Sequence, residues 1–347
     1  MLNLNSAFLG FTPKKNGFSL GLDVGSRYIK TVLLAPDGKG KFILQGYAIE
    51  KILDEPVAAI RIAFEQTGVK EAAVISSLAG TSVVARYIEL PVMTDKELNT
   101  AIEFEAEKVI PYNINEVVVD CCRVENIDDK KMRVILVAAK KDFVFDRIKI
   151  LNAANIQPKV LDVDAFALMN AFTSSNKGTA ELSALLNIGA NVTNLNIVKG
   201  QRSFLCRDIN FGSDEISRIM NEAADAVENE ETTDEDWLLK IDELSVDMRK
   251  KVLAALNEMI NRLADEVRLS FDFFENRYGE VIKAIYLSGG LAKVEVVNTL
   301  MKNEFDCEVS KWNWAEAVSM GERVVAEDIY RDYPQLALAY GLALRGF

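Results

Sequence analysis

Two short segments of the chain carry residue types that suit them to hold phosphate groups. Residues 20–34 read LGLDVGSRYIKTVLL, and residues 184–198 read ALLNIGANVTNLNIV. Each consists of an apolar strand, a polar residue, a glycine turn and a second apolar strand, so each predicts a β-hairpin. At a glycine, backbone N–H groups can approach a phosphate oxygen without a side chain intervening. Two such hairpins facing each other would clamp a polyphosphate from both sides.

The first hairpin adds side chains that suit a nucleotide with a metal ion. The Ser26 hydroxyl is a further donor, and each hydrogen bond to a charged phosphate contributes about 1.5–3 kcal/mol. Asp23 would repel phosphate, so the role we expect for it is to hold Mg²⁺ through water. In the second hairpin, Asn187 takes the place of Asp23 and Gly189 that of Gly25. The matched pair predicts a duplicated architecture with the site between its halves.

A third glycine turn lies near the end of the chain. Residues 283–300, KAIYLSGGLAKVEVVNTL, predict a strand, a turn at Gly289 and Gly290, and a helix. A glycine turn before a helix N-terminus suits a phosphate, or the sugar and base of a nucleotide. Because it follows the two hairpins in this order, it supports the interpretation of the hairpins as a nucleotide clamp.

The elements around these turns predict an α/β protein. Alternating apolar residues between turn signals indicate strands, and apolar residues at helical spacing indicate helices. Thr94 and Glu97 form a capping box, which predicts a helix from there to about Val109. The strands expected are 18–24, 29–35, 41–49, 72–77, 81–90, 116–124, 132–140, 157–162, 183–188, 192–198, 201–209 and 282–287, and the other helices are 54–67, 142–153, 164–172, 246–276, one from about 292, and 334–345.

Composition limits the chemistry that this chain can do. Its 347 residues include no histidine, which excludes a Ser-His-Asp triad, a Cys-His pair and His-ligated zinc. The net charge of −12 argues against binding to nucleic acid or to an anionic membrane surface. The sequence has no apolar run of about 18 residues, and its N-terminal residues lack the order of a secretory signal. We therefore expect a cytoplasmic protein with reduced cysteines.

With these motifs in place, the sequence resembles the actin, Hsp70 and sugar-kinase superfamily, and within it the PilM family of type IV pilus and type II secretion assembly proteins. The stretch 90–112 is the part most specific to this branch. The segments that carry the resemblance are GLDVGSRYIK (21–30), LPVMTDKELNTAIEFEAEKVIPY (90–112), AAKKDFVFDRIKILNAANIQPKVLDVDAFALMNAF (138–172), LLNIGANVTNLNIVKG (185–200), DEVRLSFDFF (265–274), LSGGLAK (287–293) and AYGLALRG (339–346).

The resemblance implies an actin-like, ribonuclease H-like fold, in which duplicated domains surround a nucleotide cleft and a small subdomain is inserted in the first half. On this basis we expect an N-terminal tail at 1–17, a first domain at 18–175 with the insert at about 87–125, and a second domain at 176–347 with its own second subdomain at about 213–285. Within that last range, residues 222–236 contain eight acidic residues and no Lys or Arg, which indicates a solvated loop or helix end rather than a metal site.

The resemblance also implies the residues that bind ATP or ADP with Mg²⁺. Glu266 has a second interpretation as an ordinary solvated residue of a helix. The implied roles are the first phosphate loop for Asp23, Gly25 and Ser26, the second for Asn187, Gly189, Ala190 and Asn191, the sugar for Gly212, the ribose or adenine for Glu266, and the base or phosphate end for Gly289, Gly290 and Leu291.

Members of the family act as cytoplasmic adaptors that bind a short cytoplasmic peptide at the start of the membrane protein PilN. The resemblance therefore implies a PilN-like partner, an indirect association with the inner membrane, and contacts with other inner-membrane or motor components of the pilus. The insert at about 87–125 would shape the peptide groove.

Two departures from the family pattern bear on hydrolysis. Asn187 stands where Asp is usual, and an amide binds Mg²⁺ weakly and cannot accept a proton at neutral pH. Leu291 adds bulk where a small residue is usual. At most a weak ATPase is expected.

Three alternatives remain open from the sequence. The first is a small-molecule kinase, for which Asp162 or Asp164 would supply the carboxylate base. The second is a filament-forming protein resembling FtsA. The third is a protein of the same fold that binds no nucleotide.

Overall fold

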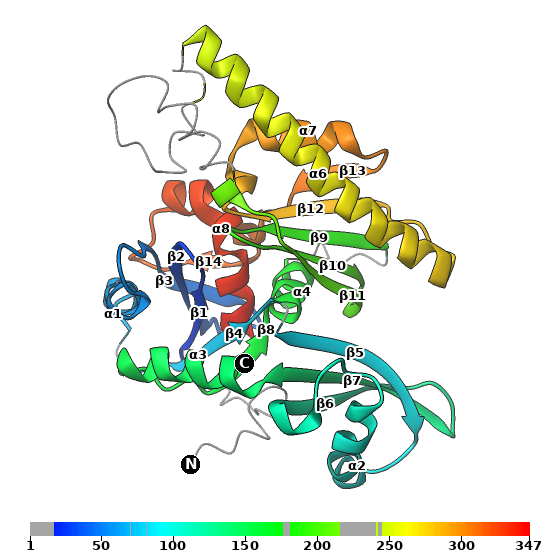
Figure 1. Ribbon diagram of the computed structural model, residues 1–347. Helices are drawn as coiled ribbons and strands as arrows, with labels where there is room; N and C mark the ends of the chain where they lie inside the picture. The colour runs from blue at the N-terminus through cyan, green and yellow to red at the C-terminus, as the bar shows by residue number, and fades with distance from the viewer. Residues whose placement is uncertain (1–16, 70, 81, 176–180, 216–240, 242–244) are drawn as a thin grey trace.

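The computed structural model describes residues 17–69, 71–80, 82–175, 181–215, 241 and 245–347 (Figure 1). The acidic run at 222–236 and most of the N-terminal tail lie outside these residues. Within them the chain forms two large sheets, one in each half, and a smaller third sheet.

The first large sheet contains the first hairpin at its centre. Its order is β14-β3-β2-β1-β4-β8; β1, β2 and β3 run antiparallel, and β4 and β8 continue parallel to β1. The strands are β1 (Ser19–Val24), β2 (Tyr28–Pro36), β3 (Phe42–Lys51), β4 (Ala73–Leu78), β8 (Val160–Val163) and β14 (Ser319–Met320).

The second large sheet repeats the order and directions of strands β3-β2-β1-β4-β8 of the first. Its order is β11-β10-β9-β12-β13, with the second hairpin, β9–β10, in the place of β1–β2. The strands are β9 (Ser183–Ile188), β10 (Thr193–Lys199), β11 (Arg202–Ile209), β12 (Ala284–Gly289) and β13 (Glu308–Lys311). The shared topology confirms the duplication that the two hairpins predict.

The third sheet is inserted in the first half, between β4 and β8. It has the order β5-β7-β6, and α2 covers one face through Leu98, Ile102 and Ala106. Its elements are β5 (Val83–Pro91), α2 (Asp95–Glu107), the short η2 (Ile114–Glu116), β6 (Val117–Asn126) and β7 (Lys131–Lys140). Because β7 pairs with both other strands, the inserted sheet extends past the expected range 87–125 on both sides. The capping box of α2 is confirmed: both of its hydrogen bonds between Thr94 and Glu97 are present.

Two helices lie between the large sheets, as Figure 1 shows: α4 (Asp164–Ser174) and α8 (Ala326–Leu344). The backbones pack so closely here that a Cβ on Gly341 would lie 1.8 Å from the carbonyl oxygen of Ala167, and one on Gly21 would lie 1.9 Å from that of Ala339. These glycines allow α8 to pass between β1 and α4, which places the base of both hairpins on one rigid core.

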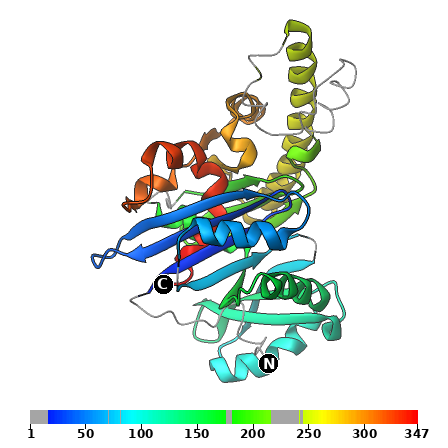
Figure 2. The same ribbon diagram turned by 90° about the vertical axis from the view of Figure 1, so that its left-hand side faces the viewer.

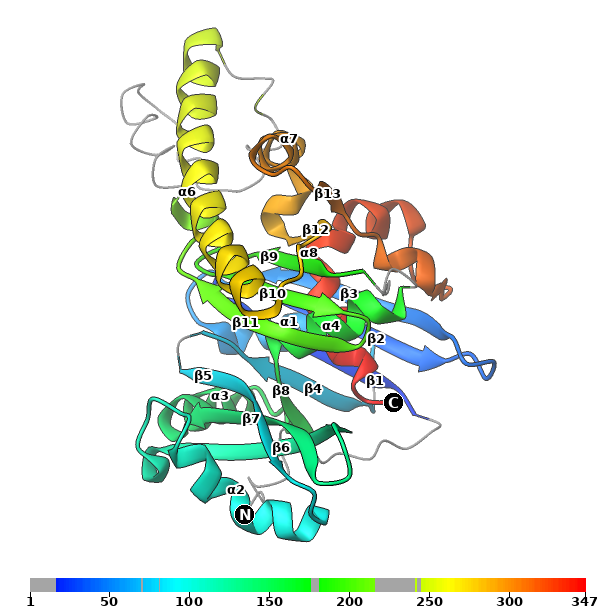
Figure 3. The same ribbon diagram turned by 90° about the vertical axis from the view of Figure 1, so that its right-hand side faces the viewer.

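The remaining helices cover the outer faces of the sheets. In the first half these are α1 (Pro56–Gln66) and α3 (Lys141–Ala153), seen over the first sheet and the insert in Figure 2. In the second half α6 (Val246–Tyr278) crosses the outer face of its sheet, as Figure 3 shows, and packs beside α7 (Glu295–Glu304).

Several elements near the end of the chain differ from the sequence expectations. The last helix begins at Ala326, earlier than the expected start at 334. Pro334 lies inside this helix and does not interrupt it. The short strands β13 and β14 were not expected, and the helix expected from about 292 is a short turn of 3-10 helix, η5 (Gly290–Lys293), followed by α7. Since β14 pairs with β3 and α8 packs on β1, the chain returns from the second half to the first.

None of the helices among the described residues is long and apolar enough to span a membrane. The four cysteines, all of them described, are unbridged.

Candidate functional site

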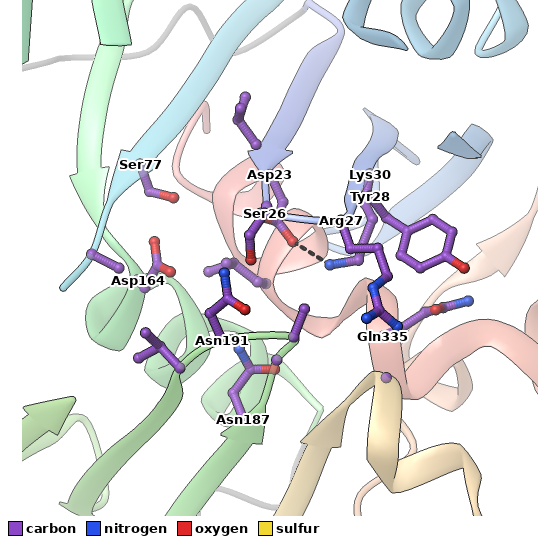
Figure 4. Close-up of a pocket in the computed structure, with 18 of the residues that line it drawn as sticks. Asp23, Ser26, Arg27, Tyr28, Lys30, Ser77, Asp164, Asn187, Asn191 and Gln335 are labelled. Atoms are coloured by element: carbon purple, nitrogen blue, oxygen red, sulfur yellow. Dashed lines mark hydrogen bonds and ion pairs between the residues drawn. The ribbon is translucent and has the colours of Figure 1, made fainter. Parts of the chain in front are cut away.

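The turns of the two hairpins face each other across a cavity of about 200 Å³. Figure 4 shows Asp23, Ser26 and Lys30 of the first half opposite Asn187 and Asn191 of the second. Of the predicted site residues, those that line this cavity are Asp23, Gly25, Ser26, Asn187, Gly189, Ala190, Asn191 and Gly290. The structure therefore brings together the two hairpins and the third glycine turn, which are far apart in the sequence.

The two turns are built in the same way. The Gly25 N–H donates to the carbonyl oxygen of Tyr28 at 3.2 Å, and the Gly189 N–H donates to that of Val192 at 3.1 Å. An added Cβ would lie 2.8 Å from the first of these oxygens and 2.9 Å from the second, so a side chain at either glycine would force the turn to open. These two N–H groups already donate hydrogen bonds within the turns. A phosphate would therefore be contacted by the residues at the tips, beginning with Ser26 and Ala190.

The hairpins differ in charge. In the register of β1 and β2, Asp23 lies opposite Lys30, and their side chains form an ion pair of 3.0 Å. The corresponding positions of the second hairpin are Asn187 and Asn194. Ser288 donates a hydrogen bond of 3.3 Å to Asn187 Oδ1. The second hairpin has thus kept the geometry of the first without its charges.

Two further charged residues enter the cavity from elements outside the hairpins. Asp164, at the start of α4, lies near Ser77 at the end of β4 (Figure 4), and Arg147 reaches the cavity from α3. Burial, with a smaller contribution from the negative charge of Asp23, raises the pKa of Asp164 to about 7. Burial lowers the pKa of Arg147, and Asp164 and Asp23 oppose that shift. The cavity is therefore lined by both acidic and basic groups.

The two acids considered for a kinase lie in different places. Asp164 lines the cavity, whereas Asp162 is buried elsewhere, 3.5 Å from Nε of Arg345. Burial raises the pKa of Asp162 to about 6. Of this pair, Asp164 is therefore the carboxylate that could act on a ligand in the cavity.

The third glycine turn is positioned by the second hairpin. Gly289 pairs with Ile188 and has a φ of 91°, and a Cβ on it would lie 2.3 Å from the Ile188 carbonyl oxygen. This places the next residue, Gly290, at the cavity. Leu291 is 1% exposed and packs into the core of the second half. The Leu291 side chain is therefore directed away from the cavity, whereas the resemblance implies a place at the base or phosphate end of the nucleotide.

Gly212 and Glu266 do not line the cavity. Gly212 packs against the second hairpin, where an added Cβ would lie 2.1 Å from the Ala190 carbonyl oxygen. Glu266 forms an ion pair with Arg207 on the face of α6 and β11. Gly212 thus packs against the turn of the second hairpin, and the Glu266 carboxylate is paired with Arg207.

Polar contacts join the two halves beside the cavity. Arg27, at the tip of the first hairpin, forms an ion pair with Asp214, which follows β11 in the chain. The Gly80 N–H, just after β4, donates to the Asp208 carboxylate on β11. These contacts hold the hairpins at their observed separation.

A metal ion would need ligands from outside the protein. Among the described residues, no group of three or more acidic or cysteine side chains is gathered to hold a metal. Asp23 faces the cavity, and Mg²⁺ is commonly held by one or two carboxylates together with water and phosphate oxygens. The residues present therefore fit Mg²⁺ bound together with a phosphate ligand.

Solved structures share this fold. The PilM protein of a PilM–PilN type IV pilus biogenesis complex is 24% identical to this chain, with 94% of this chain and 98% of that chain covered and a TM-score of 0.78. A diol dehydratase-reactivating factor in nucleotide-free form is 10% identical, with 95% and 99% covered and a TM-score of 0.55. The ethanolamine utilization protein EutJ from Carboxydothermus hydrogenoformans is 10% identical, with 98% and 94% covered and a TM-score of 0.52.

These likenesses confirm the expected fold class, in which duplicated actin-like domains of α/β type surround a cleft. The family model described as "Type IV pilus assembly protein PilM" matches residues 21–347, which is nearly the whole chain. The chain therefore belongs to the PilM family of type IV pilus assembly proteins.

Proposed function

We propose that this protein is a cytoplasmic, nucleotide-binding adaptor of type IV pilus assembly that holds ATP or ADP with Mg²⁺ between its two hairpins. The observation that carries the proposal is the pair of equivalent glycine turns facing one another across a polar cavity. Lys30 supplies positive charge for the phosphates, and Asp23 supplies the carboxylate for Mg²⁺.

The size of the cavity indicates how the nucleotide enters. Pockets that enclose a whole small-molecule ligand measure roughly 300–1,000 Å³, and this cavity measures about 200 Å³. It suits the phosphate groups, so the halves would part to admit the sugar and base. The ion pair between Arg27 and Asp214 would open in that step.

Calorimetric titration with Mg·ADP tests nucleotide binding. The wild-type protein should bind, and Gly189→Ala should bind about 5- to 150-fold more weakly, since overpacking of about 1–3 kcal/mol would displace the turn. Gly17→Ala is the matched control, because the space around Gly17 is open. A wild-type protein that gives no binding heat, or equal affinities in all three proteins, would contradict the proposal.

Hydrolysis would be weak. Asp164 is the carboxylate best placed to accept a proton from an attacking water, since it lines the cavity and its pKa of about 7 is near the operating pH. At position 187 the chain has an amide, where the family pattern usually has a second carboxylate. Slow release of inorganic phosphate that disappears in Asp164→Asn would support this role.

The partner that we propose is the cytoplasmic N-terminal peptide of a PilN-like inner-membrane protein. Family membership and the likeness to a PilM solved in complex with PilN support it. We place the peptide at the insert, within the originally expected range of about 87–125, and other pilus inner-membrane or motor components remain further candidate partners. Through the PilN-like protein the chain would be peripheral to the inner membrane.

A synthetic peptide from the N-terminus of the PilN-like protein of the same organism tests the partner. The labelled peptide should bind with a measurable change in fluorescence anisotropy, and a scrambled peptide of the same composition should not. Equal binding of both peptides would remove the specific contact that the adaptor role requires.

A further inference from the structure

Helix α3 directly continues the inserted sheet. It begins at Lys141, directly after the last residue of β7, which is the central strand of that sheet. Ile135 and Val137 of β7 share one buried core with Val144 and Leu151 of α3. A displacement of the inserted sheet is therefore transmitted to α3 without an intervening loop.

Arg147 projects from α3 into the cavity between the hairpins. Its Nη1 donates a hydrogen bond of 3.0 Å to the carbonyl oxygen of Val24. Val24 separates Asp23 from Gly25, so this contact reaches the start of the first turn. A charged donor to a carbonyl forms a stronger hydrogen bond than a neutral donor does.

The Val24–Gly25 peptide group is held at both of its ends. Arg147 binds its carbonyl oxygen, and the carbonyl oxygen of Tyr28 accepts its N–H at 3.2 Å. Because a peptide group is planar, these two contacts fix the orientation in which the chain enters the turn. The direction of the donors at the tip, from Ser26 onward, depends on that orientation.

We propose that Arg147 is a positioning residue that couples the inserted sheet to the first hairpin. Its side chain acts by holding the Val24 carbonyl oxygen and not by contacting the bound ligand. An event at the insert, such as binding of a partner, moves β7 and α3 together and changes the hold of Arg147 on the turn. Since coupling between two sites is reciprocal, a ligand at the hairpins also changes the stability of the insert. This inference rests on the proposed nucleotide binding.

The test compares the full-length wild-type protein with Arg147→Met, Arg147→Lys and Arg61→Met. Arg61→Met is the matched control, because Arg61 also donates to a carbonyl of α3, that of Ala153, but lies away from the cavity. Mg·ADP affinity is measured by calorimetry. Hydrogen exchange of peptides covering 131–153 is measured without and with saturating Mg·ADP.

In the wild-type protein and in Arg61→Met, Mg·ADP should slow exchange within 131–153. Arg147→Met should bind Mg·ADP about tenfold more weakly or worse, as expected for loss of a charged hydrogen bond, and should show no such protection at saturation. Arg147→Lys, which keeps a charged donor, should recover part of both effects. This partial rescue distinguishes positioning from a general loss of folding.

Wild-type affinity in Arg147→Met, or undiminished protection of 131–153 in that variant, would overturn the inference. If the wild-type protein itself fails to bind Mg·ADP, the proposed function fails instead. Exchange of the amides at 24–28 without nucleotide then decides on Arg147: faster exchange in Arg147→Met would support its role, and unchanged exchange would refute it.

Discussion

The carboxylate of Asp164 leads to a prediction about stability and pH. Asp164 faces the cavity at the start of α4, where burial and the charge of Asp23 raise its pKa to about 7 from an ordinary value of 3.8. The folded protein therefore retains this proton at a pH where the unfolded chain has lost it. Its contribution to stability is fully present below about pH 4 and is lost as the pH rises through about 7.

The size of the effect follows from the pKa. One pKa unit corresponds to 1.36 kcal/mol, so the shift of Asp164 would lower the free energy of unfolding above pH 7 by at most about 4 kcal/mol. Asp164→Asn removes the titration and keeps an oxygen that can accept the hydrogen bond from Ser77. We expect this variant to exceed the wild type by about 2–4 kcal/mol at pH 8 and by only about 1 kcal/mol near pH 4.5.

Urea unfolding of the nucleotide-free protein at these two pH values measures the difference. Asp162 also titrates in this range, with a pKa of about 6, but it is present in both proteins and cancels in the comparison. Asp272→Asn, on the exposed side of α6, serves as the control for a change of surface charge. A stability difference between Asp164→Asn and the wild type that is the same at both pH values would refute the account of this site.

Three further predictions concern the hairpins. Asp23→Ala should weaken the binding of Mg·ATP more than that of metal-free ADP, since its carboxylate is assigned to Mg²⁺; equal losses in calorimetry would remove that role. Asn187→Asp should raise the rate of phosphate release from ATP, because it restores a carboxylate while keeping an acceptor for Ser288; an unchanged rate would show that the missing charge does not limit hydrolysis. Gly212→Ala should shift the second hairpin, since its Cβ would lie 2.1 Å from the Ala190 carbonyl oxygen, and should reduce Mg·ADP affinity about tenfold; wild-type affinity in that variant would show that the hairpin does not depend on Gly212.

Local sequence patterns predicted the parts of the site that are locally encoded. A hairpin depends on alternating apolar residues and on a turn residue within about fifteen positions, so β1–β2 and β9–β10 could be recognised and matched to each other. The Gly289–Gly290 turn was predicted for the same reason. The duplicated architecture followed once the two hairpins were seen as copies.

The contributions of Arg147 and Asp164 to the cavity could not be predicted in this way. Each lies on a helix and reaches the cavity through the packing of elements distant in sequence, and a charged residue on a helix usually indicates a solvated face. A sequence signal existed for Asp164, which follows an apolar strand directly, but it did not distinguish Asp164 from Asp162.

The errors near the end of the chain have a physical cause. The last helix was expected only over the apolar residues 334–345, and Pro334 removes one backbone donor from any helix that contains it. The buried packing of α8 between α4 and β1 outweighs that loss. The short strands β13 and β14 depend on pairing with distant strands, which the sequence around them does not show. The direction of Leu291 likewise follows from the core around it.

A crystal structure grown with Mg·ADP tests the proposed phosphate clamp most directly. We predict that the two phosphates lie between the turns at Gly25 and Gly189, with the metal on the side of Asp23. Phosphates bound at another place on the protein, with the space between these two turns unchanged and filled by solvent, would contradict the account.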